Sequence, residues 1–242
     1  MAIIPAHPRD AFIKNIFATI APEIDILSSL FCFGMDSIWR KKLVELAKIQ
    51  RGEKILDVCA GTGKLAFLLA GKASEQQGSV IGADFCQEML EVAKKKLGAD
   101  ASRYVSFVLS DAKDLIFDDN VFDVVTVGFG MRNILDTSMA LHEVHRVLKP
   151  GGRFYCLELT CPQTRWLMPF YNYYCFNIMP AVAKMVLNTD IPYNYLPRSI
   201  QAFPLADEFR HIIERCGFND VKVYRLSFGI ATIFEARKQT PI

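Results

Sequence analysis

A carboxylate and a glycine turn follow each other closely in this chain, in an arrangement that suits a nucleotide-like cofactor. Asp57 ends a short apolar run, and Gly61, Thr62 and Gly63 follow it before a stretch of helix-forming residues. Glycines let a ligand lie against bare backbone, and a helix that begins there offers a positive N-terminus. The pattern therefore predicts a cofactor site between a buried strand and a helix.

Asp57 bears on the chemical class of that cofactor. Taken alone, residues 61–66 fit the dinucleotide fingerprint, and Asp84 lies about twenty residues on, where a ribose partner belongs. A carboxylate at the end of the first strand would repel a pyrophosphate, whereas it suits the cationic amine and sulfonium of S-adenosylmethionine. A triphosphate loop is excluded because Val58 and Leu65 stand where glycine and a hydroxyl are needed. We expect S-adenosylmethionine and keep a nicotinamide-dependent oxidoreductase as the alternative.

The elements that would position these groups follow from short apolar stretches between turn signals. Strands rich in β-branched and aromatic residues are expected at 54–57, 79–84, 105–110, 122–128 and 152–159. Their spacing predicts parallel strands with helices between them and ligand groups at their carboxyl ends. Asp84 would then accept from ribose hydroxyls, and Asp111 with Ala112 would hold the adenine.

The last part of the chain is expected to complete the same fold. Residues 205–216 read as a helix closed by Gly217, and 221–226 and 230–236 read as two strands of a hairpin. We divide the chain into a helical cap (1–50), a cofactor-binding core (51–160), a helical lid that forms an acceptor pocket (161–204), and a last helix with an antiparallel strand pair (205–242).

Composition excludes several classes of function. The net charge of +2 comes with no basic stripe, so no nucleic-acid partner is expected, and the lysines at 94–96 read as a solvated helix end. Seven cysteines without a C-x-x-C pair predict neither disulfides nor zinc, and His142 and His145 have no third ligand nearby, so no metal is expected. Residues 1–7 lack a secretory signal, which favours the cytoplasm.

Two apolar regions flank the predicted core. Residues 166–183 carry no charge, but Pro169 and Pro180 interrupt them and Asn172 and Asn177 would be costly in lipid. We expect a helical lid over a hydrophobic ligand, with an extra core helix as the alternative. Ahead of the core, helical patterns at 10–20 and 36–47, the second capped by Asp36, would either cover the cofactor pocket or pack against the sheet edge.

Several stretches together resemble one family. They are residues 33–40, 57–63, 128–133, 146–153 and 195–200, and they look like the UbiE/MenG family of quinone C-methyltransferases over nearly the whole chain. The Leu-Lys-Pro-Gly-Gly turn is common to many methyltransferases, whereas Gly-Phe-Gly-Met-Arg-Asn is a narrower pattern. The resemblance implies a Rossmann-like class I methyltransferase, an α/β fold with a seven-stranded, mostly parallel sheet of order 3-2-1-4-5-7-6.

The resemblance also implies a reaction and its residues. A methyl group would pass from S-adenosylmethionine to a ring carbon of a prenylated quinol, with demethylmenaquinol as the first expected acceptor, a ubiquinol precursor second, and another apolar small molecule as the alternative. Arg132 and Asn133 would act on the acceptor. The cofactor-binding positions would be Asp57, Gly61, Thr62, Gly63, Asp84, Phe85, Asp111, Ala112 and Gly128.

A prenylated acceptor resides in a bilayer, so the resemblance further implies peripheral contact with the inner face of the membrane, through the apolar cap and lid. A homodimer or a quinone-biosynthesis assembly is compatible with the sequence.

The chain departs from the family pattern at three positions. Relatives usually have Asp where Lys64 stands, Tyr where Ile24 stands, and in many cases Ser where Gly128 stands. Lys64 would bring a cation near a loop that should face a sulfonium. We therefore expect its long stem to carry the charge outward into solvent.

Overall fold

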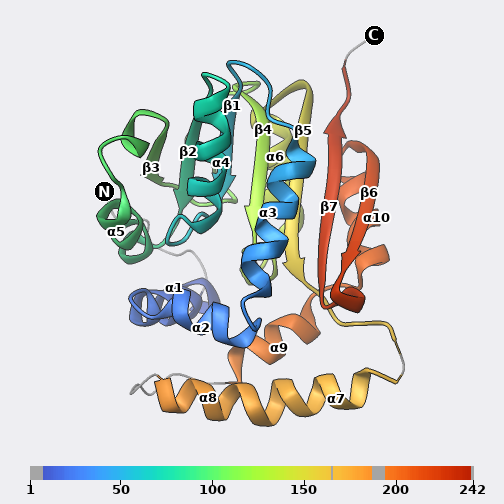
Figure 1. Ribbon diagram of the computed structural model, residues 1–242. Helices are drawn as coiled ribbons and strands as arrows, with labels where there is room; N and C mark the ends of the chain where they lie inside the picture. The colour runs from blue at the N-terminus through green and yellow to red at the C-terminus, as the bar shows by residue number, and fades with distance from the viewer. Residues whose placement is uncertain (1–7, 165, 187–193, 241–242) are drawn as a thin grey trace.

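The computed structural model describes residues 8–164, 166–186 and 194–240 (Figure 1). Two sequence-based expectations concern residues outside this range: the absence of a secretory signal at 1–7, and the part of the lid at 187–193.

One seven-stranded sheet forms the centre of the molecule, with the order β3-β2-β1-β4-β5-β7-β6 that the family resemblance implies. Neighbouring strands pair in parallel from β3 to β5, and β7 pairs antiparallel with both β5 and β6. The strands are β1 (Lys54–Val58), β2 (Ser79–Asp84), β3 (Val105–Leu109), β4 (Phe122–Gly128), β5 (Leu148–Leu159), β6 (Phe218–Leu226) and β7 (Ala231–Lys238).

Helices precede, connect and follow these strands. The α-helices are α1 (Pro8–Ile20), α2 (Ile24–Phe31), α3 (Met35–Ala47), α4 (Lys64–Glu75), α5 (Gln87–Lys96), α6 (Thr137–Val147), α7 (Met168–Tyr173), α8 (Met179–Val186), α9 (Tyr195–Ala202) and α10 (Ala206–Arg215). Shorter helical segments are η1 (Ala101–Arg103), η2 (Met131–Asn133), η3 (Tyr174–Ile178) and η4 (Ser227–Gly229).

Helices pack on both faces of the sheet, which explains why its central strands are apolar on both sides. Apolar side chains of α6 and α10, such as Leu141 and Phe209, pack on one face together with Val125. Leu43 of α3 and Leu69 of α4 pack on the other face together with Val124. The core is therefore divided into two layers by the sheet.

Helices α1, α2 and α7 to α9 gather beyond the carboxyl ends of the parallel strands (Figure 1). Because the connections that follow β1 to β5 also lie at that edge, cofactor residues and cap residues meet there. No helix among the described residues is both long enough and apolar enough to cross a membrane.

Three expectations about local structure need correction. Strand β5 begins at Leu148, four residues before the expected start, because Leu148 already pairs with Phe122 across a shift in register. Asp36 does not cap α3, since the cap residue is Gly34, with a φ of 74°, and the Asp36 carboxylate is used in ion pairs. The prolines in 166–183 do not break the helix, which continues from α7 through the π-helical η3 into α8.

Candidate functional site

The glycine turn after β1 has the conformation that its sequence predicts. Gly61 and Gly63 have φ angles of 54° and 84°, a region that side-chain-bearing residues seldom occupy. A Cβ on Gly63 would lie 2.7 Å from Phe67 and 2.8 Å from Phe107, so glycine is also required there by packing. Gly61 has no atom within 4 Å of its Cβ position, which leaves an open face of backbone at the pocket.

Asp57 lies at the bottom of this pocket with only 1% of its surface exposed. The Thr126 hydroxyl donates to its Oδ1 at 2.7 Å, while Oδ2 is buried without a hydrogen-bond partner among the described residues. Burial raises the pKa of Asp57 to about 7, although the Thr126 hydrogen bond acts in the opposite direction. A buried carboxylate oxygen without a donor is suited to a cationic or hydrogen-bond-donating ligand.

Asp84 has a second role that the sequence did not reveal. The backbone N–H of Gly61 donates to its Oδ2 at 2.8 Å, and the N–H of Cys86 donates to its Oδ1 at 2.9 Å. Asp84 therefore fixes the glycine turn as well as bordering the pocket, where Phe85 follows it. Burial raises the pKa of Asp84 to about 6, against the effect of these backbone donors.

The remaining expected cofactor positions border the same pocket, with the exception of Gly63. Thr62, Asp111, Ala112 and Gly128 line it, whereas Gly63 shapes the turn behind it. At Gly128 a Cβ would approach Leu65 to 3.0 Å, so a serine there would press on the first turn of α4. The structure thus brings residues from the ends of four strands to one cavity.

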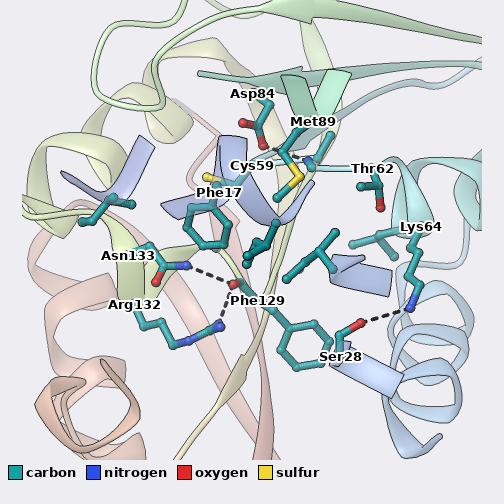
Figure 2. Close-up of a pocket in the computed structure, with 18 of the residues that line it drawn as sticks. Phe17, Ser28, Cys59, Thr62, Lys64, Asp84, Met89, Phe129, Arg132 and Asn133 are labelled. Carbon is teal, nitrogen blue, oxygen red and sulfur yellow. Dashed lines mark hydrogen bonds between the residues drawn. The ribbon is translucent and has the colours of Figure 1, made fainter. Parts of the chain in front are cut away.

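Helices α1 and α2 cover this cavity, whereas α3 packs on one face of the sheet, so each of the two interpretations holds for part of the amino-terminal region. Apolar side chains of α1 and α2 line the pocket: Ile13, Ile16, Phe17, Ile20, Leu27 and Phe31. Figure 2 shows the Phe17 ring beside Cys59 and near Met89, inside the cavity. The cap also has polar attachments, because Asp10 of α1 forms a 2.5 Å ion pair with Lys113, next to Asp111 and Ala112.

The expectation that Lys64 points into solvent is wrong. Its ammonium contacts the Asp25 carbonyl at 3.0 Å, the Ser28 and Ser29 hydroxyls at 3.1 Å each, and the Asp36 carboxylate at 3.3 Å. Figure 2 shows the side chain extending to Ser28 of α2. These acceptors attract the cation more strongly than solvent does because Asp36 is buried.

Asp36 pairs with a second cation, Arg40, at 2.5 Å. Burial opposes ionisation of Asp36, but Arg40 and Lys64 outweigh it and lower its pKa.

Asp25 connects the cap to the cofactor turn. The Thr62 hydroxyl donates to its Oδ1 at 2.6 Å, and the Lys96 ammonium pairs with its Oδ2 and contacts the Thr62 carbonyl at 3.3 Å. Lys94 and Lys95 are exposed as expected, but Lys96 is not simply solvated. The Asp25 carboxylate therefore holds α2 against the glycine turn and against α5.

These contacts predict that Lys64→Met loosens the cap. The variant keeps most of the apolar stem and loses the ammonium, so we expect it to unfold at a lower temperature, with a loss of about 1–2 kcal/mol for a partly exposed charged group. Thermal unfolding without ligand measures this. Lys72→Met is the matched control in the same helix, because Lys72 pairs with Glu75 and both side chains are exposed. Equal unfolding temperatures for the two variants would contradict the role of Lys64.

Arg132 and Asn133 lie in η2, just beyond the end of β4, and both side chains point to the carbonyl of Phe129 (Figure 2). Arg132 Nη1 donates to Phe129 O at 2.5 Å and to Glu158 Oε1 at 2.6 Å. The Arg132 side chain is only 9% exposed, and its Nε is buried without a partner. The guanidinium is thus both an ion-pair partner and a lining group of the pocket.

The lid region reaches Asn133 through a tyrosine. The Tyr195 hydroxyl at the start of α9 donates to Asn133 Oδ1 at 2.9 Å, and burial raises the pKa of Tyr195. Tyr195, Leu196 and Ala183 line the pocket. Within 166–183, by contrast, Tyr171, Cys175 and Met179 pack in an apolar cluster behind the pocket wall. The segment therefore acts mainly as a packed wall, with α9 supplying the polar contact.

The residues present fit the donor expected from the sequence. The buried Asp57 oxygen without a partner suits an onium group. The open backbone at Gly61 allows a ligand to approach closely, and the Asp84 carboxylate can accept from a ribose. A diphosphate at the glycine turn would instead meet the Asp57 carboxylate, which has like charge. The described residues contain no group of three or more histidine, cysteine or acidic side chains placed to hold a metal ion.

Comparison with known proteins agrees with this geometry. The ubiE/COQ5 methyltransferase family matches residues 6–238. The chain belongs to this family. A family relative from Rickettsia bellii (strain OSU 85-389), named ubiquinone/menaquinone biosynthesis C-methyltransferase UbiE, is 37% identical, over 97% of this chain and 96% of its own length. The demethylmenaquinone methyltransferase of Bacteroides fragilis (strain ATCC 25285) is 36% identical, over 93% of this chain and 92% of its own.

Solved structures agree on the fold of this ubiE/COQ5 family member. A SAM-dependent methyltransferase from Aquifex aeolicus superposes with a TM-score of 0.60 and 19% identity, covering 82% of this chain and 88% of that one. This likeness concerns the Rossmann-like architecture, and the sequence relatives are what make the chain a methyltransferase by family.

Proposed function

We propose that this ubiE/COQ5 family member transfers a methyl group from S-adenosylmethionine to a ring carbon of a prenylated quinol, with demethylmenaquinol as the first acceptor. One observation carries the proposal: a single cavity is bordered by the cofactor turn on one side and by Arg132 and Asn133 on the other, with apolar cap helices between them. The names of the relatives support the same acceptor class.

S-adenosylmethionine, when bound, supplies an electrophilic methyl group on a sulfonium. Asp57, Thr62, Asp84 and Asp111, with the Gly61 backbone, would hold it. The apolar side chains of α1 and α2 exclude water from the region beside it. Holding two reactants in near-attack geometry supplies roughly 7–11 kcal/mol in well-oriented reactions, so positioning dominates.

Arg132 and Asn133 act on the acceptor. A quinol ring carbon becomes nucleophilic when its phenolic proton leaves, and the ring later loses the proton from the methylated carbon. Arginine stays protonated and is a poor base, so Arg132 stabilises the developing phenolate or orients the water that removes the proton. Oδ1 of Asn133 accepts from Tyr195, and one N–H of Nδ2 donates to the Phe129 carbonyl. The second N–H of Nδ2 is left to donate to an acceptor oxygen.

The test is reconstitution with purified components. Protein, S-adenosylmethionine and chemically reduced demethylmenaquinol in detergent should give a quinone heavier by one CH₂ and an equal amount of S-adenosylhomocysteine. The oxidised quinone should not react, because its ring is electron-poor. Transfer to a ubiquinol precursor alone would move the proposal to that acceptor. Saturable binding of NAD without binding of S-adenosylmethionine, measured by thermal shift, would overturn it.

We also propose peripheral contact with the inner, cytoplasmic face of the membrane. Three aromatic residues are highly exposed: Phe33 of the cap by 79%, Phe170 of the lid by 70%, and Phe228, in η4 between β6 and β7, by 74%. Ring contacts join Phe33 to Tyr174 and Phe228 to Trp166. Aromatic side chains of this kind favour the membrane interface, and a prenyl tail keeps the acceptor in the bilayer.

Vesicle flotation tests this contact. The double variant F170S/F228S should reduce the fraction of protein on vesicles several-fold, because each ring loses its apolar contact with lipid. Ile116→Ser is the control, since Ile116 is 64% exposed and lies in the connection between β3 and β4. Absence of wild-type protein from vesicles, with and without quinone in them, would refute the contact.

A further inference from the structure

A charged residue that the reaction scheme leaves unused lies beside the acceptor groups. Glu158 is on β5 and is fully buried, with 0% of its surface exposed. A buried carboxylate is costly by several kcal/mol unless donors satisfy it. The donors that satisfy the buried Glu158 carboxylate therefore indicate what this residue does.

Most of the hydrogen bonds to Glu158 come from one residue. Arg132 donates through Nη1 to Oε1 at 2.6 Å and through its backbone N–H to Oε2 at 3.1 Å. The third donor is the N–H of the next residue, Leu159, at 2.8 Å. Glu158 thus holds both the main chain and the side chain of Arg132.

The sheet makes this contact rigid. β4 and β5 pair in parallel, with Gly128 opposite Leu157, so the residues that follow β4 meet the end of β5. Arg132 Nη1 is fixed between Glu158 and the Phe129 carbonyl, which sets the plane of the guanidinium. Arg132 lines the pocket, so this orientation is set at the pocket wall. A planar guanidinium held at one nitrogen has its remaining donors aimed in fixed directions.

We propose that Glu158 is a positioning residue for acceptor methylation: it fixes the orientation of Arg132, so that the guanidinium is held in one place at the wall of the pocket where the acceptor would bind. The inference rests on the proposed function. Glu158 itself touches neither reactant and takes no proton. Its carboxylate also balances the charge of Arg132, so that the pocket wall contains an ion pair and not a lone buried cation.

Glu158→Gln tests the proposal with little change in shape. The variant removes the negative charge and one of the two carboxylate oxygens that accept from Arg132. We therefore expect kcat/KM for the quinol to fall about 10–100-fold. The dissociation constant for S-adenosylmethionine should stay within about twofold of wild type. Glu158→Asp keeps the charge on a shorter stem and should recover part of the loss. Glu235→Gln is the matched control: Glu235 is a buried strand carboxylate that pairs with Tyr224 and Lys222, away from the pocket.

A double-mutant cycle separates positioning from a general structural role. If Glu158 acts through Arg132, adding Glu158→Gln to Arg132→Ala should lower kcat/KM by less than about threefold further, because the residue to be positioned is gone. Two effects that multiply would overturn the proposal, as would wild-type kcat/KM in folded Glu158→Gln. Failure of the wild-type protein to methylate any quinol would overturn the proposed function instead.

Discussion

Arg132→Ala should lower kcat/KM for the quinol about 10²–10⁴-fold while the protein still binds S-adenosylmethionine. The expected size follows from the loss of a positioned group that handles a proton or a developing oxyanion. Arg132 lines the cavity and is held there by Glu158 and the Phe129 carbonyl, so its guanidinium is in place before the acceptor arrives. Steady-state kinetics with varied quinol, beside calorimetry with the cofactor, measure both quantities.

A second substitution protects this experiment against unfolding. Removing Arg132 leaves Glu158 as a buried carboxylate without its main partner, which typically costs about 3–5 kcal/mol of stability. Arg132→Lys keeps the positive charge but loses the planar fork, and it should give an activity between wild type and Arg132→Ala. Turnover by Arg132→Lys equal to wild type would show that a point charge suffices and that orientation of the guanidinium is unimportant.

Asp57→Asn should weaken S-adenosylmethionine binding about 10–100-fold, with a smaller effect on the affinity for quinol. Hydrogen bonds to charged groups contribute about 1.5–3 kcal/mol, and each 1.4 kcal/mol is tenfold in affinity. Asp57 offers an unpartnered carboxylate oxygen that an amide replaces only in part. Calorimetry gives the dissociation constants. Asp123→Asn is the control at the other end of the sheet, where Asp123 accepts from Lys54 and Lys149.

The raised pKa of Asp57 gives this binding a pH dependence of known sign. Burial raises the pKa to about 7 from 3.8, so the free protein holds a proton below neutrality that a cationic ligand displaces. Affinity should therefore rise with pH between 6.5 and 8 and then level off, with proton release on binding. The pKa of Asp84, raised to about 6, contributes mainly below this window.

The apoprotein should show the opposite trend in stability. The folded state holds this proton between pH 3.8 and about 7 and the unfolded state does not, so the contribution of Asp57 to stability declines as pH rises through that interval. Asp57→Asn should remove the pH dependence of affinity and reduce that of stability, to which Asp84 contributes with the same sign up to about pH 6. A wild-type affinity that is flat from pH 6.5 to 8 would contradict the assignment of Asp57.

The strands, and the meeting of the candidate cofactor residues at one pocket, could be predicted because their signals are local. Apolar runs that end in Asp57, Asp84, Asp111 or Gly128 place these residues at the carboxyl edge once the strands are parallel. The sheet order came from the family resemblance. Apolar periodicity likewise predicted the helices of the cap, but it left open whether they cover the cavity.

Contacts between distant segments could not be read from local patterns. The environment of Lys64 depends on acceptors 28 to 39 residues away, so its long stem alone suggested solvent. Tyr195 meets Asn133 only because α9 packs beside η2, 62 residues from it in the chain. Glu158 did offer a signal, because an acidic residue inside an apolar strand is unusual. Its partner, Arg132, lies in η2 after the neighbouring strand β4, which the local pattern does not reveal.

The tie between Tyr195 and Asn133 divides the chain's two recognition tasks between different stretches of sequence. All the proposed cofactor positions lie at or before residue 128, whereas the Asn133 side chain is held by the Tyr195 hydroxyl, which follows residue 194. Substitutions in α9 can therefore change which acceptor the protein binds while its affinity for the methyl donor stays the same. Such enzymes can therefore diverge toward new acceptors through substitutions in one short helix, while the Rossmann-like part of the chain stays unchanged.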